Sequence, residues 1–299
     1  MIKKLVAIVL LALLLWGAYV SYTLLSSPPK LSARWGTVTE TNTELIIEGE
    51  WNRPLLLPVS LENTTMGFMG IPIARTERVE LSGENALIAL SIDNQNLISA
   101  LFKYLENGQS GTFEVSFKGT ALKVIPLRFS VTRNVGMDVF KTFNFTSESK
   151  PVLGGLAYTP ALLETKVTRV EEKDGKGTLI ADMRLYNPNS FPIPLSNLTF
   201  DVYANDVKIG TGYLLKPTTI PAKDYATVRT TIELDKSALA RAWALHVKNG
   251  ERSTIEVQMG VSVSLLGKNL KIPLKTEKRY LETHIIEDIN GALAGLVRG

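Results

Sequence analysis

Few side chains in this chain could carry chemistry. It has two histidines, His246 and His284, and no cysteine, so disulfides and thiolate chemistry are excluded and a structural zinc site is disfavoured. His246 falls on the apolar side of a predicted helix. His284 has Glu282, Glu287 and Asp288 nearby, but not in a metal-binding pattern such as His-Glu-x-x-His. We therefore predict no catalytic residue, no metal ligand and no cofactor.

Other sequence features that could form an active site are weak. Glu171, Glu172 and Asp174 could bind a cation, but Lys173 lies among them and favours a solvated turn. Gly210-Thr211-Gly212 is not part of a phosphate-binding loop, and the nucleophile pattern Gly-x-Ser-x-Gly is absent. The chain is therefore not expected to be an enzyme.

The N-terminus predicts a membrane anchor. Residues Leu5 to Leu25 are uncharged and mostly apolar, and as a helix they would span about 30 Å, the thickness of a bilayer core. Lys3 and Lys4 precede them, so the N-terminus should stay in the cytoplasm and the rest of the chain should lie outside it in a single-pass arrangement. A cleaved signal peptide is the alternative, but the run is long for one.

Charge and sequons add to this picture. The net charge is +4, from 33 cationic and 29 anionic side chains, with no long basic stripe, so no nucleic-acid partner is expected. The membrane and an unidentified lipid or protein are the expected partners. Three Asn-x-Ser/Thr sequons, at Asn63, Asn144 and Asn197, are weak candidates for glycosylation.

After the predicted anchor, one structural unit occurs twice. Residues 93–108 and 235–250 both begin with Asp and end with Asn-Gly. Each reads as a helix with an Asp N-cap, an apolar face and a glycine just past its end. His246 lies on the apolar face of the second. Matching strand sequences follow both segments, which indicates a duplication.

The remaining segments alternate apolar and polar residues between turn residues, as antiparallel strands do. Asn205-Asp206 is expected to form one of the hairpin turns. We predict a mainly β chain of two tandem fibronectin- or immunoglobulin-like antiparallel β-sandwiches, each with one helix, after an N-terminal transmembrane helix. The expected divisions are an anchor (1–29), a divergent first sandwich (30–135), a linker (136–160), a second sandwich (161–284) and an amphipathic tail (285–299).

The second unit resembles a known family. Asn187-Pro188-Asn189, Phe191-Pro192-Ile193-Pro194, Gly210-Thr211-Gly212 and Ile220-Pro221-Ala222 are similar to motifs of the water-stress-and-hypersensitive-response (WHy) domain, of the group-2 late-embryogenesis-abundant family. The resemblance implies a fibronectin-like sandwich, stress or desiccation protection, and no enzymatic activity. The motif residues themselves are interpreted as turn-forming residues rather than as ligands.

Three functions follow as hypotheses. The first is a membrane-anchored, extracytoplasmic, non-enzymatic binding or protective module, acting in envelope stress or desiccation. The second is binding of a lipid or other apolar ligand between the sheets, and the third is a structural role in the cell envelope. The tail at 285–299 is spaced like an amphipathic helix, which could pack on the second sandwich, lie on the membrane or mediate self-association, packing being favoured.

Overall fold

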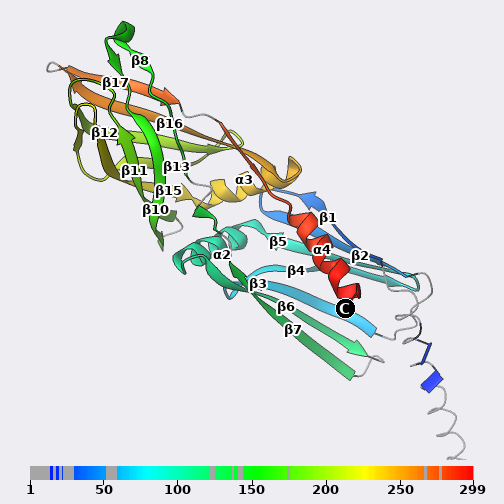
Figure 1. The fold of residues 1–299 in the computed structure, drawn as a ribbon. Helices are drawn as coiled ribbons and strands as arrows, with labels where there is room; N and C mark the ends of the chain where they lie inside the picture. Colours follow the sequence, from blue (N-terminus) through cyan, green and yellow to red (C-terminus); the bar gives the residue numbers. More distant parts are fainter. Residues whose placement is uncertain are drawn as a thin grey trace, which may run out of the picture.

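A computed structural model describes most of the chain after residue 29 (Figure 1). The described residues are 14–15, 18–19, 22, 30–51, 59–121, 125–136, 138–140, 144–173, 176–265, 268–275 and 278–298. The predicted anchor at residues 5–25 therefore lies largely outside them. Among the residues that are described, no helix is long and apolar enough to cross a bilayer.

The first unit is a single antiparallel sheet of seven strands. They pair in the order β1-β2-β5-β4-β3-β6-β7. The strand bounds are β1 Lys30–Val38, β2 Asn42–Glu50, β3 Val59–Phe68, β4 Ile71–Ser82, β5 Asn85–Asp93, β6 Ser110–Ala121 and β7 Ile125–Gly136.

The second unit is also one antiparallel sheet. Its main path is β10-β11-β15-β13-β12-β16-β17, with β14 paired to β12 and β18 paired to β16. The strand bounds are β10 Ala161–Lys173, β11 Lys176–Tyr186, β12 Ile193–Ala204, β13 Val207–Leu214, β14 Thr218–Ile220, β15 Tyr225–Asp235, β16 Arg252–Leu265, β17 Lys268–Lys275 and β18 Arg279–Glu282.

The two units share one topology. When the short strand β14 is left aside, β10–β13 and β15–β17 take the places of β1–β7 in the same spatial order. A helix follows the fifth strand in both: α2 (Asn94–Glu106) in the first unit and α3 (Lys236–Lys248) in the second. This common order agrees with the repeat read from the sequence.

The predictions for the ends of the two helices are confirmed. Asp93 Oδ1 accepts a hydrogen bond from Asn96 N at 2.9 Å, and Asp235 Oδ1 accepts one from Ala238 N at 2.8 Å, so both aspartates are N-caps. Gly108 and Gly250, after the helices, have positive φ, which glycine adopts without a steric penalty. The Asn205-Asp206 turn between β12 and β13 has φ of 49° and 62°, as its residue types predict.

The mainly β prediction, with one helix late in each unit, is confirmed. The expected pair of separate sheets in each unit is corrected, because each unit is one continuous, strongly curled sheet. In the second unit the two halves of the sheet face each other across the core (Figure 1). The strand twist that curls a wide sheet makes a second sheet unnecessary.

The segment between the sheets packs against the second unit. It forms the small hairpin β8 (Pro151–Val152) and β9 (Ala157–Tyr158), with the 3₁₀ turn η2 (Leu153–Gly155) between them. Phe145 is buried in the core of the second unit, and Ser147 pairs with Leu162 of β10. This segment therefore contributes to a core as well as connecting the two sheets.

Helix α2 joins the two units. Its residues Ile98, Phe102, Tyr104 and Leu105 belong to the large hydrophobic core of the second unit. The ring of Phe102 lies so close to Gly177 of β11 that a Cβ there would be 2.0 Å from it. The glycine therefore allows the helix of one unit to sit directly on the sheet of the other.

The C-terminal tail forms helix α4 (Ile285–Arg298). Ile286, Ile289 and Leu293 pack against the core cluster of the first sheet, and Figure 1 shows α4 lying over that sheet, beside β1 and β2. The amphipathic helix is therefore as expected, but it packs on the first unit rather than the second.

Candidate functional site

The Asn187-Pro188-Asn189 motif forms a buried hydrogen-bonded turn. Asn187 is fully buried, and its Nδ2 donates to the carbonyl oxygens of Phe191 at 2.8 Å and Pro221 at 2.9 Å. Its Oδ1 accepts from the backbone N of Asn189 at 3.0 Å, while the Asn189 side chain exchanges two hydrogen bonds with the backbone of Tyr158. The polar atoms of the motif are thus used in holding loops together, as the turn interpretation predicts.

The two glycines of Gly210-Thr211-Gly212 serve close packing in β13. A Cβ at Gly210 would lie 2.6 Å from the carbonyl oxygen of Glu233, and one at Gly212 would lie 2.1 Å from the ring of Phe200. The motif therefore accommodates a neighbouring strand and an aromatic ring, and it forms no phosphate cradle.

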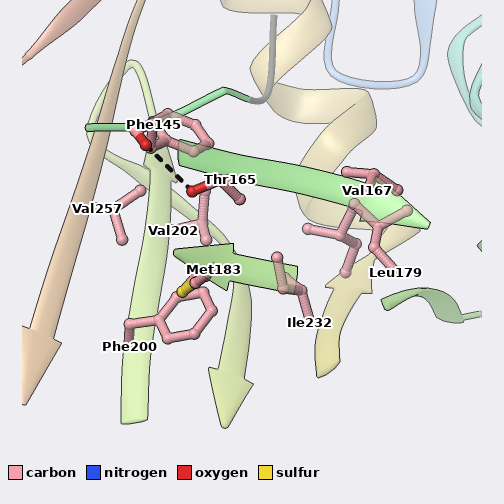
Figure 2. A pocket seen from close by; sticks show the side chains of 10 residues that line it. Phe145, Thr165, Val167, Leu179, Met183, Phe200, Val202, Ile232 and Val257 are labelled. Atoms are coloured by element: carbon pink, nitrogen blue, oxygen red, sulfur yellow. Dashed lines mark hydrogen bonds between the residues drawn. The ribbon is translucent and has the colours of Figure 1, made fainter. Parts of the chain in front are cut away.

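A small cavity lies inside the second unit (Figure 2). Its volume is about 20 Å³, which is room for about one water molecule. The wall is apolar, and the one hydroxyl in it, that of Thr165, already donates to the carbonyl oxygen of Phe145 at 3.1 Å. The lining residues are Phe145, Thr165, Val167, Leu179, Met183, Phe200, Val202, Ile232, Leu234 and Val257.

A second hollow is open and polar. It lies on the outer side of β3, β4, β6 and β7, has a volume of about 250 Å³, and includes Thr65, Glu114, Ser116 and Thr132 in its wall. Hydrogen bonds from Ser130 and Ser116 lower the pKa of the Glu114 carboxyl. Within the described part of the chain, no group of three or more histidines or carboxylates could hold a metal ion.

The main polar constellation lies at the junction of the units and centres on Glu251. This residue follows α3, is buried, and has φ of 62°. Its Oε1 accepts from Trp35 Nε1 at 2.8 Å and Ile286 N at 3.0 Å; its Oε2 accepts from Ile285 N at 2.5 Å and the Thr283 hydroxyl at 3.1 Å. One carboxylate thus caps the N-terminus of α4 and binds a tryptophan of the first unit.

His246 lies beside this carboxylate. Its Nδ1 is 2.9 Å from Ser253 Oγ, and its Nε2 is 2.8 Å from Thr283 Oγ1. Because the Thr283 hydroxyl donates to Glu251, it must accept from Nε2–H, so Nδ1 accepts from Ser253. Trp243 stacks on the His246 ring and meets Trp35 edge to face.

Both titratable groups at the junction have shifted pKa values. Burial raises the pKa of Glu251, but four hydrogen bonds, led by that of Ile286 N–H, outweigh it and hold the pKa below its ordinary value. Burial lowers the pKa of His246, and the negative charge of Glu251 offsets this only in part. At neutral pH the pair is therefore a carboxylate and a neutral imidazole.

The contact between Ser253 and His246 has the geometry of a nucleophile and its base, but its surroundings argue for a structural role. Both side chains are buried, and neither of the two hollows described above is lined by them. The other ring nitrogen contacts a threonine rather than a carboxylate. His246 is therefore a structural residue at the junction; its burial agrees with its predicted place on the apolar helix face, whereas its contact with the junction was not predicted.

The first unit has a counterpart of this cap. Gln109 follows α2 as Glu251 follows α3, and its φ is also 62°. Its Oε1 accepts from Val139 N at 2.5 Å and Phe140 N at 3.0 Å, two residues that pack on the core of the second unit. In each unit, the residue after Asn-Gly therefore caps the segment that leaves the sheet and packs on the other unit.

The other predicted residues are not brought together. His284 is exposed, with Nδ1 3.4 Å from Glu287 Oε2. Glu171 and Glu172 form ion pairs with Arg169 and Lys236, and Asp174 lies outside the described residues.

The three sequons lie on separate elements. Asn63 is exposed on β3, and Asn144 is exposed before β10 with its Oδ1 accepting from Thr165 N at 3.0 Å. Asn197 lies on β12, where its side chain is not described. Modification of these asparagines stays a prediction.

Some important junction residues were missed from the sequence: Trp35, Glu251, Thr283 and Asn290. Asn290, on α4, accepts from Ala33 N at 2.6 Å and donates to Ala33 O at 3.1 Å, like an added strand on the edge of β1. The one sequence signal that could have indicated Glu251 is its position: it follows Asn-Gly in the second repeat, as Gln109 does in the first.

Comparisons with known proteins gave matches to part of the chain. A search of the curated proteins found no match. A crystal structure of a protein from Archaeoglobus fulgidus is 22% identical, covers 41% of this chain and 98% of its own, and gives a TM-score of 0.35. A solution structure from Arabidopsis thaliana is 23% identical, with 42% and 85% covered and a TM-score of 0.31.

A third structure, described as a late embryogenesis abundant (LEA) protein, is 15% identical, with 42% and 72% covered and a TM-score of 0.24. These TM-scores are too low to support an inference. Residues 182–278, however, match the family model described as Late embryogenesis abundant protein, so this part of the second unit is similar to that family.

Proposed function

We propose that the chain is a membrane-anchored, extracytoplasmic, non-enzymatic module that binds and protects other molecules under stress, with its second unit a WHy-type domain. The observation that carries the proposal is the match of residues 182–278 to the Late embryogenesis abundant family. The apolar run at residues 5–25 supports the anchor.

The location is tested with cells that express the full chain carrying a C-terminal tag. Protease added outside the cytoplasmic membrane should remove the tag, and alkaline washing should leave the chain in the membrane fraction. A tag protected until the membrane is opened would contradict the proposed orientation. Release by the alkaline wash would contradict the anchor.

Protection is tested with dye-loaded liposomes that carry the full chain. They are dried and rehydrated, and dye leakage is compared with that of liposomes carrying an equal mass of an unrelated single-pass protein. A similar comparison uses the residual activity of an enzyme dried alongside. The proposal expects less leakage or more residual activity; equality with the control in both assays would refute it.

A second function, binding of an apolar ligand, is favoured by the largely apolar cavity of the second unit. With a volume of about 20 Å³, it would have to open widely, since ligand pockets measure about 300–1,000 Å³. The strands facing each other around it are the place where such an opening would occur.

Native mass spectrometry of the detergent-purified full chain tests this second function. A bound lipid should add its mass to the wild type, and Val202→Phe, which fills the cavity, should remove that addition. Circular dichroism checks that the variant folds. An equal mass addition in both proteins, or none in either, would argue against this function.

A further inference from the structure

The end of the first sheet that lies far from the second unit carries exposed apolar side chains. Leu81, Ile125 and Leu127 are 53%, 49% and 42% exposed. They lie near the ends of β4 and β7 and belong to neither hydrophobic core cluster. We call these three residues and the strand ends around them the rim (Figure 1, lower right).

Strand register shows that these three side chains point to the concave face of the sheet. Ile125 and Leu127 pair with Ala121 and Gly119 of β6, on the same face as Val115. Val115 pairs with Met66, which packs on the core cluster. On β4, Leu81 pairs with Ala86 of β5. Ala86 is on the same face of β5 as Ile88, which packs on the core cluster of the first sheet.

Helix α4 covers only part of this concave face. Its apolar residues contact the cluster formed by Ala33, Leu45, Ala74, Leu90 and Ile92, and Asn290 holds it to β1. The core is thus closed near β1, β2 and β5, while the exposed apolar residues of β4 and β7 remain open at the rim. Uncovered apolar side chains gathered at one end of a sheet, unlike those scattered singly, mark a surface that meets a partner.

The course of the chain indicates which partner lies at this rim. Strand β1 begins at the rim, at Lys30. Lys30 pairs with Glu50 of β2, Glu50 pairs with Asn85 of β5, and Asn85 pairs with Ser82, the residue after Leu81. Only residues 26–29 separate Lys30 from the apolar run that ends at Leu25. Four extended residues reach at most about 14 Å, so an anchored chain would hold the rim against the bilayer surface.

We propose that the rim of the first unit docks on the bilayer, with Leu81, Ile125 and Leu127 entering the interface between headgroups and acyl chains. The inference rests on the proposed anchor at residues 5–25. Three half-exposed side chains are too few to hold a free protein on a membrane, but the tether supplies a high local concentration of lipid. Glu50, exposed at the end of β2, keeps the β2 side of the rim in water, so the unit leans on its β4 and β7 side.

Because the chain has no cysteine, single labels can be placed at will. The full chain is assembled into phosphatidylcholine nanodiscs as Leu81→Cys, Ile125→Cys or the control Asp206→Cys, each carrying an environment-sensitive fluorophore. Asp206 lies in the β12–β13 turn of the second unit with a 92% exposed side chain. Thermal unfolding midpoints within a few degrees of the wild type show that each labelled chain is folded.

Labels at positions 81 and 125 should show blue-shifted emission and be quenched by nitroxide-bearing lipids about twofold or more beyond the label at 206. Quenching equal to that of the 206 label would overturn the proposal. A blue shift without lipid quenching, as a second copy or another protein on the rim would give, also overturns it. Failure of the chain to enter the discs would instead overturn the anchor.

Discussion

Replacing Glu251 by alanine should release α4 from the first unit. The change removes the cap of α4, worth about 1 kcal/mol, and leaves the N–H of the half-buried Trp35 without its acceptor, at about 1–3 kcal/mol. Relief of the cost of burying a carboxylate returns part of this. A net loss of about 2–3 kcal/mol corresponds to opening that is roughly 30- to 150-fold more frequent, since about 1.4 kcal/mol is a factor of ten.

Hydrogen exchange of residues 285–298 in the full chain, read by mass spectrometry, measures this opening directly. Glu251→Gln is the matched control, because Gln109 makes the equivalent cap with one amide oxygen; its exchange should lie between wild type and alanine. Glu282→Ala removes only an exposed ion pair with Arg252 and should change little. Exchange in Glu251→Ala within about threefold of wild type would refute the capping role.

The remaining predictions concern pH and glycine. The pKa of His246 is lowered in the fold, so its stabilising effect is fully present above about pH 6.5 and is lost as pH falls below it; Glu251 adds a second loss below about pH 4.5. Urea unfolding should show a lower free energy of unfolding at pH 5 than at pH 7.5, and His246→Gln should reduce that difference. An equal difference in the variant and the wild type would contradict the role given to His246. Gly212→Ala should cost about 1–3 kcal/mol, because its Cβ would meet the Phe200 ring, and an unchanged thermal midpoint would show that the ring moves aside freely. Gly291→Ala, with open space around its Cβ in α4, should instead stabilise the protein by up to about 1 kcal/mol, and a fall in the same midpoint would contradict this.

Local signals in the sequence predicted most of the secondary structure. The Asp N-caps, the Asn-Gly ends and the Asn205-Asp206 turn depend on the chemistry of neighbouring residues, and each has the conformation expected. Strand β10 (Ala161–Lys173) is harder to recognise, because the alternation of charged and apolar residues along it is interrupted by two register shifts. Such bulges break the period of two on which strand recognition depends.

Contacts between the two units could not be predicted from local sequence signals. Helix α2 buries residues on two sides, Ile98 and Phe102 toward the second unit and Leu97 toward the first, whereas its periodicity predicted a single buried face. The tail was recognised as amphipathic, but the choice of sheet depends on Asn290 and Glu251 meeting groups that lie far away in sequence. That each unit forms one sheet likewise depends on the order in which its strands pair, which the alternation of residues does not encode.

The caps at Gln109 and Glu251 both lie where one unit packs on the other. Each holds the chain at the point where it leaves its own sheet and turns toward the other unit: Val139 and Phe140 pack on the second core, and α4 packs on the first. Each unit thus contributes a segment to the core of the other. The two caps are not equivalent, because the Gln109 side chain accepts two backbone hydrogen bonds, whereas the Glu251 carboxylate accepts two and also binds Trp35 and Thr283. The packing of α4 on the first unit is a contact that acid should weaken, since the lowered pKa values of Glu251 and the adjacent His246 mean that both lose their favourable protonation state as pH falls. Acid should therefore loosen the helix that lies on the concave face of the first sheet before it affects the core of the second.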